Sequence, residues 1–256
     1  MPSLWFIVPV HGRAKLASIC LRQLRRTCDS LTENGIEATA VVIGDDENLD
    51  TARDLGFGTV ERDNRFTSRK FNDGIQLACD PKINPRPADY VVPCGSDDWV
   101  DYRLFLDLPD TAMRGFQRMS FVREDGRELS TSNVAYKGGC GIRIYPREIV
   151  QLRGYRPADE DRPRGCDTSI LLNLQHAWSA RYVETLKGSP EMAVEHADSN
   201  PLQIVDWKSP DEQLNGYQEV SRWRSKEKGD PFEMLADIFP AEALDEMAEH
   251  YSLVAV

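Results

Sequence analysis

The sequence is poor in the residues that build zinc sites and covalent scaffolds. It has four histidines, and none of its six cysteines forms a Cys-x-x-Cys pair. Structural zinc sites use closely spaced Cys and His ligands, so we expect none here. Disulfide scaffolds are typical of much shorter secreted chains. We therefore expect reduced, mostly buried thiols in a cytoplasmic protein.

Long hydrophobic runs and an excess of positive charge are also missing. No apolar stretch approaches the roughly 18 residues of a membrane span, so we expect no transmembrane segment. The apolar residues 4–8 lack a basic leader and a small-residue cleavage site, which favours a first strand over a signal peptide. A net charge of −11 argues against a general nucleic-acid binder, which needs a basic surface.

The order of apolar patterns predicts an α/β fold of one main domain. Strands are expected at residues 4–8, 39–43, 59–60, 90–93, 116–122, 133–136 and 181–183. Helices are expected at residues 13–32, 50–55, 67–79, 146–152, 167–175, 212–223 and 233–251. Strands that alternate with helices indicate a mostly parallel sheet flanked by helices. We assign residues 1–205 to the domain and 206–256 to a helical extension packed on it.

Polar residues follow three of the expected strands. These segments are Pro9-Val10-His11-Gly12-Arg13, Gly44-Asp45-Asp46 and Gly95-Ser96-Asp97-Asp98. In parallel α/β sheets, ligands bind beyond the carboxyl ends of the strands, so we predict a site there.

Asp97 and Asp98 are adjacent carboxylates at one strand end. Their repulsion raises the pKa of one of them unless a cation is present, and a hard ion such as Mg²⁺ or Mn²⁺ would relieve it. The alternative is a helix N-cap formed by Ser96 or Asp97. For Asp45 and Asp46 the alternative is a turn after a strand.

Three further positions have both a functional and a structural interpretation. Lys70 and Asn72 lie at the start of a helix, where backbone N–H groups suit a pyrophosphate, or they belong to an ordinary solvated face. Asp167 opens a helix after Gly165-Cys166, as a functional acid or as an N-cap. His196 lies among acids late in the chain, although a lone histidine is more often structural.

Taken in order, these segments resemble the nucleotide-sugar glycosyltransferases of the GT-A fold, family-2 type. The resemblance is carried by the turn Pro9-Val10-His11-Gly12-Arg13, the paired acids Asp45-Asp46, the pattern Lys70-Phe71-Asn72-Asp73-Gly74, the DxD-like Gly95-Ser96-Asp97-Asp98, the glycine-rich Gly138-Gly139-Cys140-Gly141, Arg153-Gly154-Tyr155, and Cys166-Asp167 before an apolar run. It spans about residues 4–185. Two positions depart from the family pattern: Gly95 replaces the first acid of DxD, and Cys166 replaces a glutamate.

The resemblance implies a donor that is a nucleoside-diphosphate sugar, most commonly with UDP. It places Pro9, Val10, Arg13, Asp45 or Asp46, Lys70, Asn72, Ser96 and Asp97 at the donor, and Gly138 and Gly139 on the acceptor side. Asp97, Asp98 and His196 would hold Mn²⁺ or Mg²⁺. Asp167 would act as the general base of an inverting, metal-dependent transfer of a hexosyl or related sugar.

Two other functions stay open at this point. The departures at Gly95 and Cys166 suit a catalytically silent nucleotide-sugar-binding protein of the same fold. A nucleotidyltransferase is the other alternative, although His11-Gly12-Arg13 lacks the usual glycine-rich basic signature after the first strand.

The acceptor and the oligomeric state are not written in the sequence. A glycan, a protein side chain, a lipid-linked sugar or a modified DNA base all suit the pattern. The chain has an early basic cluster, which consists of Arg13, Lys15, Arg22, Arg25 and Arg26, and an acidic tail at residues 230–249. The basic cluster favours an anionic acceptor or is a solvated helix face; the tail is a docking element or a solubilising surface.

Overall fold

The computed structural model describes residues 1–45, 48–63, 66–110, 113–125, 128–135, 140–162, 165–185, 194–197, 200–208, 225–227 and 230–254. Asp46, Gly138 and Gly139, which were predicted as site residues, lie outside these ranges, as does the predicted helix 212–223. For His196 only the backbone is described.

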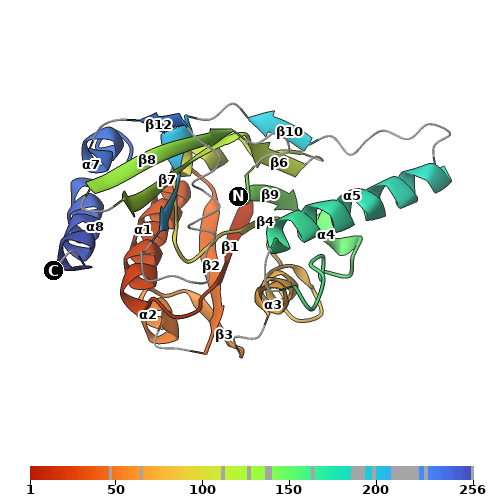
Figure 1. Cartoon of the computed structure of the whole chain (residues 1–256). Helices are drawn as coiled ribbons and strands as arrows, with labels where there is room; N and C mark the ends of the chain where they lie inside the picture. Colours follow the sequence, from red (N-terminus) through yellow and green to blue (C-terminus); the bar gives the residue numbers. More distant parts are fainter. Residues whose placement is uncertain are drawn as a thin grey trace.

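A central sheet forms the middle layer of the molecule (Figure 1). Its strands, in spatial order, are β10 (Val194–Ala197), β6 (Met113–Phe116), β9 (Arg143–Pro146), β4 (Tyr90–Pro93), β1 (Ser3–Pro9), β2 (Glu37–Gly44) and β3 (Gly58–Glu61). β4, β1, β2 and β3 are parallel, as are β6 and β10, whereas β9 is antiparallel to both of its neighbours. The predicted α/β class with a mostly parallel sheet is confirmed.

Helices cover both faces of this sheet because its strands are apolar on both sides. In β1, the side chains of Leu4, Phe6 and Val8 pack in the core between the sheet and the helices on one face. The side chain of Ile7 packs in the core on the opposite face. The first face carries α1 (Ala14–Glu33) and α2 (Asn48–Asp54); the second carries α3 (Thr67–Cys79), α4 (Arg147–Gln151) and α5 (Cys166–Thr185), as Figure 1 shows.

A second, smaller sheet continues from the end of β4. Its order is β12 (Ser225–Glu227), β8 (Glu128–Ala135), β7 (Arg118–Asp125), β11 (Ile204–Lys208) and β5 (Asp98–Val100). β11 is antiparallel to β5 and parallel to β7. Short 3₁₀ turns at Tyr102–Phe105 and Pro201–Gln203 lead out of β5 and into β11. Residues 94–97 therefore connect the two sheets.

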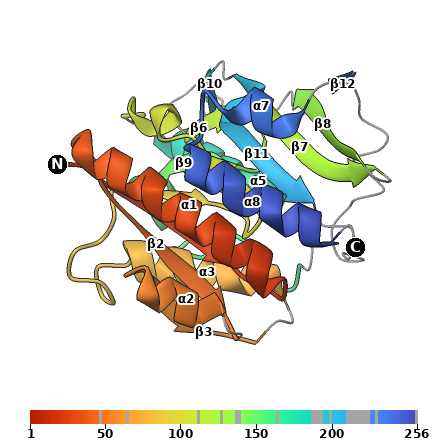
Figure 2. The same cartoon turned by 90° about the vertical axis from the view of Figure 1, so that its left-hand side faces the viewer.

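The C-terminal helices pack on α1 and on the second sheet. α8 (Ala241–Val254) lies beside α1, with α7 (Pro231–Leu235) above the second sheet (Figure 2). The buried residues they share with α1, β5 and β11 include Leu16, Ile19, Trp99, Trp207, Phe239, Met247 and Tyr251. These helices therefore pack against β5 and β11 and stabilise their positions.

Part of the basic cluster pairs with the acidic tail. Arg22 and Arg26 lie 2.9 Å and 3.3 Å from carboxylate oxygens of Glu246 in α8. Arg25 pairs with Asp29 on α1 itself, at 2.7 Å. With Arg13, which pairs with Asp97 at 2.9 Å, four members of the cluster thus have carboxylate partners within the chain, and the tail docks on α1.

The sequence predicted the first half more accurately than the second. The helix at 67–79 and the strand at 90–93 have the predicted bounds. The strand predicted at 181–183 is wrong: α5 continues to Thr185, because no Gly or Pro interrupts it after Gln175. The predicted domain boundary after residue 205 falls inside β11. Among the described helices, none combines the length and the apolar character of a membrane span.

Candidate functional site

A tight turn after β4 positions the paired acids. The backbone N–H of Gly95 donates to Asp98 Oδ2 at 2.6 Å, and Asp98 then begins β5. A Cβ at position 95 would lie 2.6 Å from Asp98 Oδ2 and 2.8 Å from Asp97 Oδ1, so glycine makes room for both carboxylates. The alternative of a helix N-cap at Ser96 or Asp97 is wrong, since residues 98–100 form a strand.

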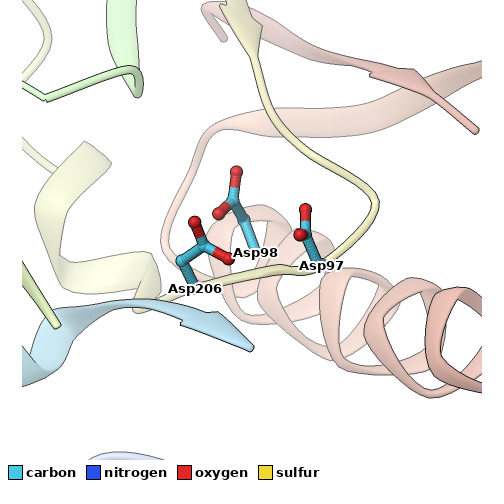
Figure 3. Close-up of side chains that lie close together, drawn as sticks. All are labelled: Asp97, Asp98 and Asp206. Atoms are coloured by element: carbon cyan, nitrogen blue, oxygen red, sulfur yellow. The ribbon is translucent and has the colours of Figure 1, made fainter. Parts of the chain in front are cut away.

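A third carboxylate joins this pair from a distant part of the chain. Asp206 on β11 lies opposite Asp98 on β5, and the Trp207 N–H donates to the Asp97 carbonyl at 2.9 Å. One carboxylate oxygen from each of Asp97, Asp98 and Asp206 lies within 4.8 Å of the others (Figure 3). We call these three residues the acid group.

Two basic side chains contact the acid group. Arg13 Nη1 donates to Asp97 Oδ2 at 2.9 Å, and another of its nitrogens reaches Ser96 Oγ at 3.4 Å. Lys208 Nζ lies 2.6 Å from Asp206 Oδ2 and 3.3 Å from Asp97 Oδ2. Arg13 has a left-handed backbone (φ 53°), a conformation that costs free energy in a non-glycine residue and turns the chain from β1 into α1.

The pKa values within the acid group diverge. Burial favours a protonated Asp97, but the charges of Lys208 and Arg13 outweigh it and hold the pKa of that carboxyl well below its usual range. Burial, together with the charge of Asp97, raises the pKa of Asp98 to about 7. Burial also raises the pKa of Asp206 well above its usual value. Full ionisation of all three acids would therefore place more negative charge here than the two basic neighbours stabilise.

The donor atoms of the acid group fit a hard divalent cation. Asp206 is only 8% exposed, and its buried Oδ1 has no hydrogen-bond partner among the described residues. A buried oxygen without a partner is costly, and a cation would satisfy it. Carboxylate oxygens are the ligands that Mg²⁺ and Mn²⁺ prefer.

Sequence reasoning missed Asp206 and Lys208 because β11 was not predicted. The only signal was a short apolar run, residues 204–208, with an acid and a base two positions apart and therefore on one face of a strand. His196 was predicted as a ligand instead. Its strand, β10, lies at the edge of the central sheet, separated from β4 by β6 and β9.

The ends of β1 and β2 form the neighbouring part of the edge. Val10 is fully buried; its N–H donates to the Ile43 carbonyl, and its carbonyl accepts from the Lys70 ammonium. A Cβ at Gly44 would lie 2.3 Å from Val10 Cγ2, so the two strand ends are in close contact. Asp45 follows directly and is exposed. Val10 and the buried Lys70 therefore support the edge rather than line its surface.

Asn72 fixes a loop to α3. Its amide nitrogen donates to the Ala158 carbonyl at 2.9 Å and to Glu160 Oε1 at 3.0 Å, while its Oδ1 accepts from the Ala158 N–H at 2.8 Å. Ser68 Oγ donates to the Glu160 carbonyl and accepts from the Arg162 N–H. We call these contacts of Asn72 and Ser68 the Asn72 clamp. They give Asn72 a structural role.

Asp167 lies in the first turn of α5 with its side chain 40% exposed. Buried Arg143 donates from Nη1 to the Asp167 carbonyl at 3.4 Å and lies 3.9 Å from Asp167 Oδ2. A Cβ at Gly141 would lie 3.6 Å from Asp167 Oδ2, so residues 140–143 pass beside this acid. Cys166, which replaces the expected glutamate, is buried and donates from Sγ to the Arg162 carbonyl.

Cys140 is buried, and the charges of both Asp98 and Arg143 affect its thiol. Burial raises the pKa of Cys140 to about 12; the charge of Asp98 adds to this rise and that of Arg143 opposes it. The thiol is therefore within electrostatic range of both groups.

The structure resembles solved glycosyltransferases. It superimposes on a mutant of Drosophila beta-1,4-galactosyltransferase 7, crystallised with manganese, UDP-Gal and xylobiose, with a TM-score of 0.52 and 12% identity over 90% of this chain and 83% of that one. Glucosyl-3-phosphoglycerate synthase from Mycobacterium tuberculosis, crystallised with Mn²⁺ and UDP-glucose, gives a TM-score of 0.41 at 13% identity over 78% and 72% of the two chains. No protein-family model matches the sequence, and no curated protein is similar to it in sequence. The likeness to the galactosyltransferase shows the fold, and the predicted GT-A fold is confirmed.

Proposed function

We propose that this protein is a glycosyltransferase that moves a hexosyl or related sugar from a nucleoside-diphosphate sugar, such as a UDP-sugar, to an acceptor hydroxyl with inversion. The observation that carries the proposal is the acid group. Three carboxylates, from β5, β11 and the turn before β5, converge beyond the end of β4 in a GT-A sheet, and one buried oxygen of Asp206 has no partner among the described residues. The structurally similar Drosophila enzyme was crystallised with manganese and UDP-Gal, which supports this choice of ligands.

The proposed donor surface lies along the ends of β1, β2 and β4. Arg13 is in contact with the acid group and offers a guanidinium to a diphosphate. Exposed Asp45 is placed to accept hydrogen bonds from a base or ribose, and the partly exposed Pro9 completes the surface, whereas Ser96 is buried beside Arg13. Val10, Lys70 and Asn72 hold this surface in place from beneath.

In the proposed mechanism, Asp97, Asp98 and Asp206 would hold a divalent ion. When bound, the ion neutralises the charge that develops on the diphosphate leaving group. Asp167 takes the proton from the acceptor hydroxyl as that oxygen attacks the anomeric carbon, and the hydroxyl becomes acidic only as the new bond forms. Arg143 fixes the first turn of α5 through the Asp167 carbonyl, and so orients the carboxylate.

Metal binding by Asp206 tests the proposal directly. We expect Asp206→Asn to weaken Mn²⁺ binding by about tenfold or more, measured by calorimetry with UDP present, and to lower transfer from a panel of UDP-sugars in parallel. The matched control is Asp101→Asn. Asp101 is also a buried acid, but its partners are Arg103 and Gln203, so this variant should keep its Mn²⁺ affinity even if it is less stable. Unchanged Mn²⁺ binding by Asp206→Asn would remove the acid group from the metal role.

A silent nucleotide-sugar-binding protein is the second candidate. The observation that favours it is Cys166, whose buried thiol leaves Asp167 as the one acid of the pair that opens α5. Asp167→Asn separates the two candidates. A catalyst should lose about 10²-fold or more of its turnover while it still binds donor. A silent binder should show donor binding but no sugar transfer with either Asp or Asn at this position.

A further inference from the structure

The ammonium of Lys208 contacts two of the carboxylates that would bind a divalent cation. Lys208 follows Asp206 by two residues on β11, so both side chains point to the same face of the strand. The residue is 8% exposed, and its ammonium contacts Asp206 Oδ2 at 2.6 Å and Asp97 Oδ2 at 3.3 Å. Two of the three acids of the acid group therefore already share one positive charge.

Charge balance distinguishes a divalent ion added beside Lys208 from one that replaces it. With all three acids ionised, Arg13 and Lys208 leave the group one positive charge short. A divalent ion added beside Lys208 would leave an excess of one positive charge in a buried place. A divalent ion that replaces the ammonium would leave no net charge, which a buried group favours.

Repulsion between the two cations leads to the same conclusion. Asp97 Oδ2 accepts from both Arg13 and Lys208, and Asp206 Oδ2 is in close contact with Lys208. An ammonium and a divalent ion that bind the same two carboxylates repel each other across a short distance, with little water between them. A lysine side chain is long and flexible, so its ammonium can leave without moving β11.

We propose that Lys208 is a resident counter-ion of the acid group, and that its ammonium leaves Asp97 and Asp206 when a divalent ion binds. The proposal rests on the metal site of the proposed function. It makes Lys208 the residue that sets the metal affinity of this protein: the lysine stabilises the metal-free acid group and competes with the ion.

The test measures Mn²⁺ binding to the full chain without nucleotide, by calorimetry and by the paramagnetic resonance of free Mn²⁺. We expect Lys208→Met to bind Mn²⁺ about tenfold or more tightly than the unmodified protein, because a competing charge is gone. Lys208→Gln is a second neutral variant that keeps a hydrogen-bond donor for Asp206. Lys208→Arg keeps the charge and should bind Mn²⁺ as weakly as the unmodified protein.

Thermal unfolding gives a second readout. The neutral variants should have a lower Tm than the unmodified protein without metal and should gain more from added Mn²⁺. If the neutral variants bind Mn²⁺ no more tightly than the unmodified protein, the competition is overturned while the metal site stands. If none of the four proteins binds Mn²⁺, both the proposed metal site and this inference are overturned.

Discussion

The acid group and the Asn72 clamp are both buried polar networks, but they differ in how well their members are satisfied. In the clamp, both ends of the Asn72 amide have partners on the loop at residues 158–160. In the acid group, carboxylates lie against one another, their pKa values diverge, and one buried oxygen has no partner among the described residues. A satisfied network is typical of scaffolding, whereas an unsatisfied one costs stability and indicates that a ligand completes it.

The largest expected effect comes from the centre of the acid group. Asp97→Ala should destabilise the fold by about 3 kcal/mol, because Arg13 and Lys208 both lose a carboxylate in a buried place, and it should abolish Mn²⁺ binding. Urea unfolding and calorimetry measure the two effects. Asp97→Asn keeps the shape and should still lose the metal. A stable Asp97→Ala variant with full Mn²⁺ affinity would contradict the functional interpretation of the acid group.

Breaking the clamp should affect stability alone. Asn72→Ala leaves the N–H and the carbonyl of Ala158 without their partner, which should cost about 2 kcal/mol in urea unfolding with no change in Mn²⁺ affinity. Asn72→Asp keeps the acceptor for the Ala158 N–H but places a carboxylate oxygen against Glu160 Oε1 and the Ala158 carbonyl, so it should cost at least as much. If Asn72→Ala instead weakened UDP binding at unchanged stability, the donor role predicted from the sequence would replace the clamp.

Gly95→Ala should weaken metal binding with little effect on stability, the opposite of the result expected for the clamp. The added Cβ would displace the carboxylates of Asp97 and Asp98, so we expect Mn²⁺ affinity to fall by about tenfold while the Tm changes by only a few degrees. Gly58→Ala is the control, since a Cβ there meets only ordinary contacts at 3.6 Å. Equal Mn²⁺ affinity in both variants would show that metal binding does not require the observed positions of the Asp97 and Asp98 carboxylates beside Gly95.

The smallest expected effect concerns an unsatisfied group that is not in the acid group. Both ring nitrogens of His250 on α8 are buried without a partner among the described residues, and burial, with help from nearby Lys15, lowers its pKa. As the pH drops below about 6.5, the ordinary pKa of histidine, His250 takes up a proton more readily in the unfolded chain than in the folded protein. The free energy of unfolding therefore decreases as the pH drops.

His250→Gln tests this sign. The Tm of the unmodified protein should fall more steeply than that of the variant as the pH drops from about 6.5 toward 5.5. Parallel curves would mean that His250 does not contribute to the pH dependence. The comparison is useful because an unsatisfied neutral ring at a helix contact predicts a stability cost only, whereas unsatisfied carboxylates predict a ligand.

Predictions from sequence worked best where local pattern decides structure. The helical spacing of residues 67–79 and the apolar run at 90–93 reproduced the observed bounds, because periodicity reports which faces are buried. They failed at β11 and at the end of α5, where short apolar runs fit either a strand or a helix. The motif at Lys70–Asn72 was located correctly, but its side chains proved to be bonded to Val10 and to the loop at residues 158–160.

The sequence by itself determined the alternation of strands and helices, the paired acids at a strand end and the polar edge where a ligand would bind. Only the tertiary structure decided which charges meet. Lys208 and Asp97 are 111 positions apart, and their contact depends on the pairing of β11 with β5. The periodicity of apolar residues indicates which face of a helix or strand is buried. The pKa of a buried carboxylate depends instead on charged neighbours that distant strands supply.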